Sequence, residues 1–190
     1  MIVQRSVLRT PIGRLTLYAK GGALAAVFFE KGEEQERLRF TRRLGEVRIE
    51  THPDPAGAVA ALRDYFAGDL GALDRIPVVP AGTEFQRAVW SALREIPAGA
   101  TMSYSGLAAR LNRPSAVRAV GAANGGNPVP VVIPCHRVVA ANGALWGYGG
   151  GLAIKRWLLT HEKALPRGVE RVPASPRLDG ERPPRLPFEA

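Results

Sequence analysis

A cysteine and a histidine stand side by side in the stretch VVIPCHRVV, residues 131–139. Cys135 is the single cysteine of the chain, so it has no disulfide partner within it. A lone cysteine in an apolar segment is commonly a small buried hydrophobe. Prolines at positions 128, 130 and 134 argue against a central strand. His136 and Arg137 are polar, which is unusual for a segment of the apolar core. Such surroundings can stabilise a thiolate, so the segment also fits a cysteine nucleophile.

The direct adjacency of the two side chains limits how the imidazole can serve the thiol. Consecutive residues of an extended segment point to opposite faces, so His136 would have to act on Cys135 through a water or a local turn. Glu162 follows Lys155 by seven residues on an expected last helix, hence on the same face. Either the two residues form a surface ion pair that contributes little to stability, or Glu162 points inward and orients His136.

The rest of the composition excludes several classes of protein. Zinc-site spacing is absent and the three histidines, at positions 52, 136 and 161, are scattered, so we expect no metal. We find neither a signal-peptide pattern nor an apolar run long enough to cross a bilayer, so we expect no membrane partner. An unpaired cysteine favours a reducing compartment, and we expect a cytoplasmic protein, associated with the nucleoid if the source is prokaryotic.

The positive charge is concentrated in the middle of the chain. Residues 1–80 carry 12 basic and 10 acidic side chains, residues 81–165 carry 9 and 3, and residues 166–190 carry 5 and 4. The segment that contains Cys135 therefore holds most of the net charge of +9. Such a block fits either a nucleic-acid partner or an ordinary solvated surface.

The elements that must position these groups fall into two parts. Residues 1–30 read as three strands, residues 30–43 as a loop or exposed helix, and residues 55–70 as an amphipathic helix. IPVVPAGT marks a boundary near residue 80. We therefore expect an N-terminal α/β domain over 1–80, a second domain over 81–165, and a disordered tail rich in proline and arginine over 166–190.

The second part is predicted to be mainly helical. A capping-box pattern at Thr83 and Gln86 begins a helix, and a last helix spans residues 152–165. Between them, two short helices at 103–111 and 115–124 flank a three-residue turn and form a helix-turn-helix candidate, although many core helix pairs look alike. The second helix has small residues and one arginine, Arg118, which suits close approach to damaged DNA as well as it suits a core helix.

Three motifs together resemble the O6-alkylguanine-DNA alkyltransferase family. They are RAVGAANGGN, NPVPVVIPCHRVV and GYGGGLAIKRWLLTHE, and the likeness covers roughly residues 83–163. The resemblance implies an α/β protein. Its first eighty residues would form a small ribonuclease-H-like domain, followed by a mainly helical domain that carries the helix-turn-helix and the active-site cysteine.

The resemblance also implies a role for each site residue. The catalytic group would comprise Cys135 as alkyl acceptor, His136 as its base through a water, Glu162 as the residue that orients the imidazole, Asn127 as the tie between the helix-turn-helix and the active-site segment, Tyr104 as a donor to the guanine ring, and Lys155 as an assisting cation. The DNA-binding group would comprise Arg118 as a finger that replaces the flipped nucleotide, with Tyr104, Ser115, Ala119 and Ala122. The base pocket would comprise Tyr148, Gly149, Val138 and Asn124.

The implied activity is DNA repair by direct transfer of an alkyl group from O6 of guanine to Cys135, with O4 of thymine an open alternative substrate. The product is a thioether, which a general base in the site cannot hydrolyse, so each protein molecule should act once and need no cofactor. The implied partner is double-stranded DNA with an alkylated guanine flipped out of the stack, bound by a monomer.

Three other readings compete with repair. A lesion-binding protein would keep the DNA-binding half but replace the acceptor thiol. A thiol hydrolase would need an imidazole that faces the sulfur. A helix-turn-helix regulator, with or without alkylation sensing at Cys135, would need a recognition helix with several long polar side chains, and a dimerisation segment.

Overall fold

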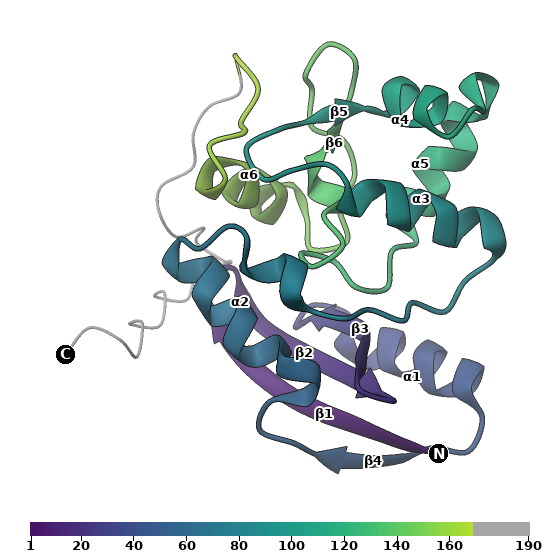
Figure 1. Cartoon of the computed structure of the whole chain (residues 1–190), viewed down its shortest axis with the longest axis vertical. Coiled ribbons are helices and arrows are strands. Elements are labelled where there is room, and N and C mark those ends of the chain that lie inside the picture. The colour runs from purple at the N-terminus through teal and green to yellow at the C-terminus, as the bar shows by residue number, and fades with distance from the viewer. Residues whose placement is uncertain (169–190) are drawn as a thin grey trace.

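The structure is a computed structural model that describes residues 1–168. It has two parts, a sheet with two helices built from the first half of the chain and a helical part built from the second half (Figure 1). The expected fold class, mixed α/β with a small N-terminal sheet and a helical C-terminal part, is confirmed. The predicted tail at 166–190 lies outside the described residues from position 169 onward.

The N-terminal sheet has four strands in the order β3-β2-β1-β4. Strands β1 (Ile2–Thr10), β2 (Gly13–Lys20) and β3 (Ala23–Phe29) are antiparallel neighbours joined by short turns, as their sequence pattern predicts. The short strand β4 (Arg48–Thr51) pairs in parallel with β1, which requires a crossover, and the helix at residues 33–44, between β3 and β4 in the chain, is part of it. Sequence analysis did not predict β4, because four mostly exposed residues carry little hydrophobic pattern.

Helices α1 (Glu33–Leu44) and α2 (Ala58–Ala67) cover opposite faces of this sheet. Alternation along β3 sends Phe28 to the cluster that includes Phe40 of α1, and Phe29 to the cluster that α2 shares. The segment predicted as a loop or exposed helix is therefore a helix. Short 3₁₀ turns at Pro55–Gly57 and Ala72–Arg75 flank α2.

The helical part is assembled around a two-stranded pair, β5 (Met102–Ser103) with β6 (Val138–Val139). Thr83 and Gln86 cap the first helix as the sequence predicts: the Thr83 hydroxyl accepts from the Gln86 amide at 3.2 Å, and the Gln86 side chain accepts from the Thr83 amide at 2.9 Å. The four α-helices are α3 (Glu84–Arg94), α4 (Tyr104–Arg110), α5 (Val117–Gly125) and α6 (Leu152–His161).

Two local predictions need correction. The second helix of the helix-turn-helix begins at Val117 rather than Ser115, because Pro114–Ala116 form a 3₁₀ turn first. The thiol segment is not extended either: Cys135–Arg137 form a 3₁₀ turn before β6. Pro134 directly precedes this turn and cannot donate to a ladder, which favours a turn over a strand.

One apolar core joins the two parts of the molecule. The largest buried cluster contains residues from β1 to β3 and α2 together with residues from α3 to α6, so packing continues across residue 80. Within residues 1–168 no helix combines the length and apolarity that a bilayer crossing requires.

Candidate active site

The thiol of Cys135 sits at the first position of the 3₁₀ turn and is 5% exposed. Burial raises its pKa to about 11, although the Asn127 side chain, the charge of Lys155 and the backbone amides of residues 135 and 136 act to lower it. The thiol is therefore protonated at neutral pH in the free protein, and nucleophilic attack requires a base.

His136 is fully buried and paired with a carboxylate. Its Nε2 lies 3.0 Å from Oε1 of Glu162. Because that oxygen is ionised, Nε2 carries the proton and donates it, which leaves Nδ1 as the free lone pair. Nδ1 has no hydrogen-bond partner among the described residues. Burial lowers the pKa of His136, so the imidazole is neutral at pH 7 and can accept a proton at Nδ1.

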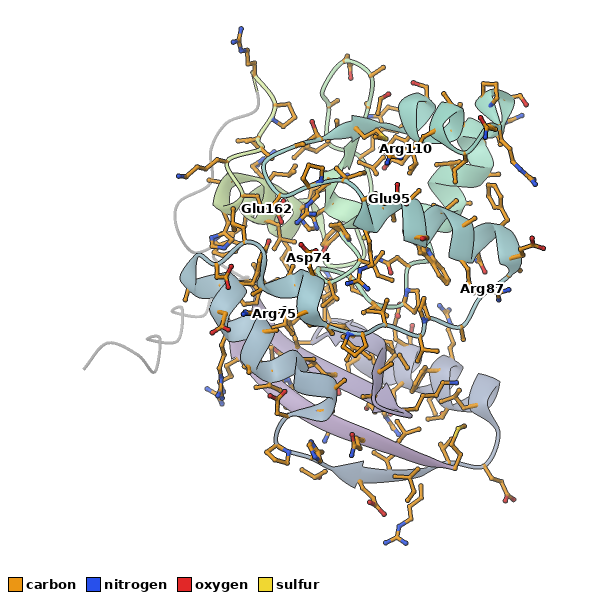
Figure 2. All side chains as sticks on the ribbon, in the orientation of Figure 1. Asp74, Arg75, Arg87, Glu95, Arg110 and Glu162 are labelled. Carbon is orange, nitrogen blue, oxygen red and sulfur yellow. The ribbon has the colours of Figure 1, made fainter. Side chains whose placement is uncertain are left out.

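Besides His136, two other residues donate hydrogen bonds to the carboxylate of Glu162. Arg137 donates to both carboxylate oxygens at 2.9 Å, and the hydroxyl of Tyr65 donates to Oε1 at 2.7 Å. Burial alone would raise the pKa of Glu162, but His136 and Arg137 outweigh it and bring that pKa well below its usual range. Figure 2 labels Glu162 at the C-terminal end of α6, inside the molecule.

Sequence analysis missed Arg137 and Tyr65 as partners of Glu162. The charge at position 137, next to the motif, was a usable signal because a buried arginine needs a carboxylate. Nothing in the local pattern around Tyr65 points to a residue 97 positions away.

Lys155 is also buried, so the alternative of a surface pair with Glu162 is wrong. Its Nζ donates to the carbonyls of Val138 at 2.7 Å and Trp146 at 2.9 Å. Burial lowers the pKa of Lys155 to about 8, partly offset by Cys135. The lysine therefore joins β6 to the glycine-rich loop, residues 146–151, and places a positive charge near the thiol of Cys135.

Two asparagines connect α5 to the thiol segment. The Asn127 side chain donates to the Ile133 carbonyl at 2.8 Å and accepts from the Val129 amide at 3.0 Å. The Asn124 side chain donates to the Cys135 carbonyl at 3.4 Å. The Asn127 side chain, just beyond the end of α5, thus holds the backbone of residues 129 and 133 that leads to Cys135, and the predicted tie to the helix-turn-helix stays a prediction.

A cavity of about 530 Å³ opens between α4, α5 and the glycine-rich loop, a size that suits a small-molecule group such as a base. Burial raises the pKa of Tyr104, which keeps its hydroxyl protonated and able to donate. Trp146, 66% exposed, stands at the cavity edge. Val138 is not among its lining residues, and the Val138 carbonyl is bonded to Lys155. The predicted site residues that line the cavity are Tyr104, Arg118, Asn124, Tyr148 and Gly149.

Cys135 lines a second cavity, of about 240 Å³, on the other side of the loop. The two cavities share Asn124 and the loop residues 147–149, and the second extends past Pro130 to the edge of β3. Cys135 thus lines the smaller cavity, which borders the larger one at these shared residues.

The outer face of α5 is made of small, exposed residues. Arg118, Ala119 and Ala122 are exposed there, and Ser115 is exposed in the turn before it. On the same helical part, Arg110 of α4 forms an ion pair with Glu95 (Figure 2). Within residues 1–168, no group of three histidine, cysteine or acidic side chains is placed to hold a metal ion.

Fold and site together define a helix-turn-helix protein with a buried thiol next in sequence to a buried histidine that is paired with a carboxylate. The family described as 6-O-methylguanine DNA methyltransferase, DNA binding domain, matches residues 84–164. A methylated-DNA–protein-cysteine methyltransferase of Mycobacterium bovis is 42% identical over 86% of this chain and 94% of its own length. One of Salmonella typhimurium is 56% identical over 57% of this chain, and the match spans 64% of that relative.

Solved structures agree with the sequence relatives. The crystal structure of Mycobacterium tuberculosis OGT in complex with DNA superposes with a TM-score of 0.69 at 38% identity, covering 86% of this chain and 93% of the other. The chain belongs to the methylated-DNA–protein-cysteine methyltransferase family.

Proposed function

We propose that this protein repairs DNA by moving an alkyl group from O6 of guanine to the sulfur of Cys135, irreversibly and once per molecule. The observation that carries the proposal is that Cys135 lines a cavity that shares Asn124 and residues 147–149 with the larger one, and is followed in the chain by a neutral imidazole whose Nδ1 has no partner among the described residues. Family membership supplies the substrate class.

The transfer is a displacement at an sp³ carbon. The thiol proton passes through a water to Nδ1 of His136, and Glu162 stabilises the imidazolium that forms. The sulfur–carbon bond forms as the carbon–O6 bond breaks, and the electron pair remains on the guanine oxygen. A hydrogen bond from the Tyr104 hydroxyl to the guanine ring stabilises this developing anion.

Deprotonation is coupled to the reaction. A thiol with a pKa of about 11 is weakly reactive in the free protein, so the base is needed during transfer. The charge of Lys155 favours the thiolate as it appears. The resulting thioether carries no carbonyl for water to attack, which makes the protein a single-turnover enzyme without a cofactor.

The target base must leave the duplex to reach the sulfur. Rotation of a nucleotide out of the stack costs about a few kcal/mol, and less for a poorly paired lesion. The exposed Arg118 on α5 enters the stack in place of the base and offsets part of this cost. The small residues Ala119 and Ala122 allow the helix backbone to approach the groove closely, and Ser115 lies at the DNA backbone.

The same proposal assigns duties along the chain. Residues 81–165 bind DNA and accept the alkyl group, and residues 1–80 form an α/β domain that supports the site through the shared apolar core. One chain supplies every proposed site residue, so a monomer suffices. The acceptor thiol must stay reduced, which fits the cytoplasm and, in a prokaryote, the nucleoid.

The test is a single-turnover experiment. The protein is incubated with duplex DNA that carries one O6-methylguanine, then analysed by intact mass and peptide mapping. We expect one added methyl group per molecule, on the Cys135 peptide, and none with Cys135→Ala. Binding without transfer would identify a lesion-binding protein or a regulator, and repeated turnover would identify a different chemistry; either result would refute the proposal.

A further inference from the structure

Among the described side chains of the first eighty residues, Tyr65 alone donates a hydrogen bond to the carboxylate of Glu162. It lies on α2, is fully buried, and its hydroxyl is 2.7 Å from Oε1 of Glu162. We propose that Tyr65 is a positioning residue: its hydrogen bond sets how strongly Glu162 holds the imidazole of His136. The catalytic meaning of this inference rests on the proposed function, although the hydrogen bonding does not.

Three donors share one carboxylate oxygen. Oε1 of Glu162 accepts from Tyr65, from Nε2 of His136 at 3.0 Å and from Arg137 at 2.9 Å. A carboxylate oxygen offers about two in-plane lone pairs, so these donors compete for the same electron density. Tyr65 makes the shortest of the three bonds and therefore withdraws charge that would otherwise strengthen the bond to His136.

The position of Tyr65 is fixed by packing between α2 and α6. Its ring makes edge contacts with the rings of Phe66 and His161, at centroid distances of 5.2 and 5.0 Å. Nε2 of His161 also lies 2.8 Å from the carbonyl oxygen of Tyr65. Burial and the charge of Glu162 raise the pKa of Tyr65 well above its usual value, so its hydroxyl remains a donor throughout the working pH range.

The charged surroundings of His136 are well defined. Glu162 favours the imidazolium, whereas Arg137 and Lys155 oppose it. Of these three charges, Glu162 is the one whose effect Tyr65 can modulate directly. The titratable groups that face the His136–Glu162 pair are Tyr65 on α2, Cys135 and Arg137 on the 3₁₀ turn, Tyr148 on the glycine-rich loop, and Lys155 on α6.

Loss of the Tyr65 hydroxyl should make His136 more basic. Without this donor, Oε1 carries more negative charge toward Nε2, and the imidazolium gains stability relative to the imidazole. The His136 titration midpoint then moves to higher pH. Because the reaction needs a neutral imidazole, the acid limb of the transfer rate moves to higher pH as well.

The matched control is Tyr18, a second fully buried tyrosine of the N-terminal part. It packs against Phe28 and Phe40 in the cluster under α1, on the sheet face opposite α2. Tyr18→Phe therefore removes the same atom from an equally buried site that does not contact Glu162.

The primary measurement is the His136 imidazole titration by NMR in the full-length free protein. We expect Tyr65→Phe to raise the midpoint by about half a unit or more, and Tyr18→Phe to leave it unchanged. A folded Tyr65→Phe protein with an unmoved midpoint would overturn the inference. If Tyr65→Phe does not fold, 3-fluorotyrosine at position 65 is used instead; its more acidic hydroxyl donates more strongly, so the midpoint should fall, and no fall would also overturn it.

The second measurement is the single-turnover methyl transfer rate against pH. We expect Tyr65→Phe to shift the acid limb upward and to slow transfer at pH 6 by less than the roughly hundredfold loss expected for removing the base itself. Binding of the lesion-bearing duplex should not change. If the wild-type protein transfers no methyl group, but Tyr65→Phe still raises the His136 titration midpoint, the proposed function is refuted and the role of Tyr65 stands.

Discussion

At the scale of single residues, the site has a buried thiol with a raised pKa, followed in the chain by a buried imidazole that is paired with a carboxylate. Burial opposes the charged form of the Cys135 thiol, whereas the neighbouring His136 is hydrogen-bonded to Glu162 through Nε2 and leaves Nδ1 without a partner among the described residues. Such a thiol resists stray oxidation and alkylation, because reactivity follows the thiolate population. Under the proposed function, in which each molecule acts once, a thiol that stays protonated in the free protein preserves the acceptor for its substrate.

The ionised state of Glu162 should link stability to pH. Its pKa in the folded protein lies below the ordinary 4.5, so it contributes stability above that pH and loses it as pH falls further. The pKa of His136 is lowered from 6.5, so the unfolded chain binds more protons there and stability also falls with pH below 6.5. Urea unfolding of the wild type should therefore show declining stability from pH 6.5 downward, and more steeply below 4.5.

Glu162→Gln tests this assignment directly. It leaves the buried Arg137 without its charge partner, and we expect a loss of roughly 3–5 kcal/mol at pH 7. The difference from the wild type should shrink below pH 4.5, where Glu162 of the unfolded wild-type chain takes up a proton that the folded carboxylate does not. Glu95→Gln, at an exposed ion pair with Arg110, should cost about 1 kcal/mol or less. A Glu162→Gln penalty that stays constant down to pH 3 would contradict the assignment.

The charge of Lys155 should be measurable through the thiol. Lys155→Met removes one of the groups that lower the pKa of Cys135, and it also leaves the Val138 and Trp146 carbonyls without their shared donor. We expect iodoacetamide to alkylate Cys135 about threefold to tenfold more slowly at pH 7, the effect of half to one pKa unit. Lys20→Met, on β2, serves as control. Equal alkylation rates in the two variants would exclude the electrostatic role of Lys155.

At the scale of elements, local signals predicted well and long-range ones did not. The capping box at Thr83, the three antiparallel strands and the paired short helices all follow from residues close in sequence. The 3₁₀ turn at Cys135 was missed because apolar residues on both sides imitate a buried strand. That turn removes the geometry assumed for an extended segment, in which Cys135 and His136 point to opposite faces.

The contacts of Glu162 show the same division. The family likeness supplied its partnership with His136, and the distance of 3.0 Å agrees with that expectation. Tyr65 and Arg137 came from the structure alone, because both depend on how α2 and the 3₁₀ turn pack against α6. Spacing along a helix fixes the face that a residue occupies, but it does not predict which residues of another element contact that face.

Helix α5 carries the prediction at this scale. Arg118→Ala should slow repair of O6-methylguanine in duplex DNA by about tenfold or more, because one contact of this kind is worth roughly 1–3 kcal/mol. Reaction with the free base O6-methylguanine should change little, since that substrate needs no flipping. Arg63→Ala, at an exposed arginine on α2, should alter neither rate. Equal losses on duplex and free base would place Arg118 in the chemistry and remove it from the role of a finger.

At the scale of the whole molecule, the N-terminal part contacts the loop that lines both cavities as well as the carboxylate bound to His136. The Phe29 ring at the end of β3 makes an edge contact with the Tyr148 ring at 5.7 Å. A Cβ atom built on Gly150 would meet the Phe29 ring at 2.9 to 3.0 Å, which real Cβ atoms essentially never do. The loop can lie against the sheet because position 150 has no side chain, and this contact holds Tyr148 between the two cavities.

This close approach predicts a specific pattern of stability. Gly150→Ala should destabilise the fold by about 1–3 kcal/mol, because the added methyl overpacks against a buried ring. Gly149→Ala is the matched control: a Cβ there meets nothing within 4 Å, so its effect should stay within about 0.5 kcal/mol. Phe29→Leu should make room for the methyl, so the double variant Gly150→Ala with Phe29→Leu should lose less than the sum of the two single losses. Chemical denaturation of the four proteins measures this coupling. Additive losses would mean that the two parts of the molecule do not meet at this point, and that the loop holds Tyr148 without help from the sheet.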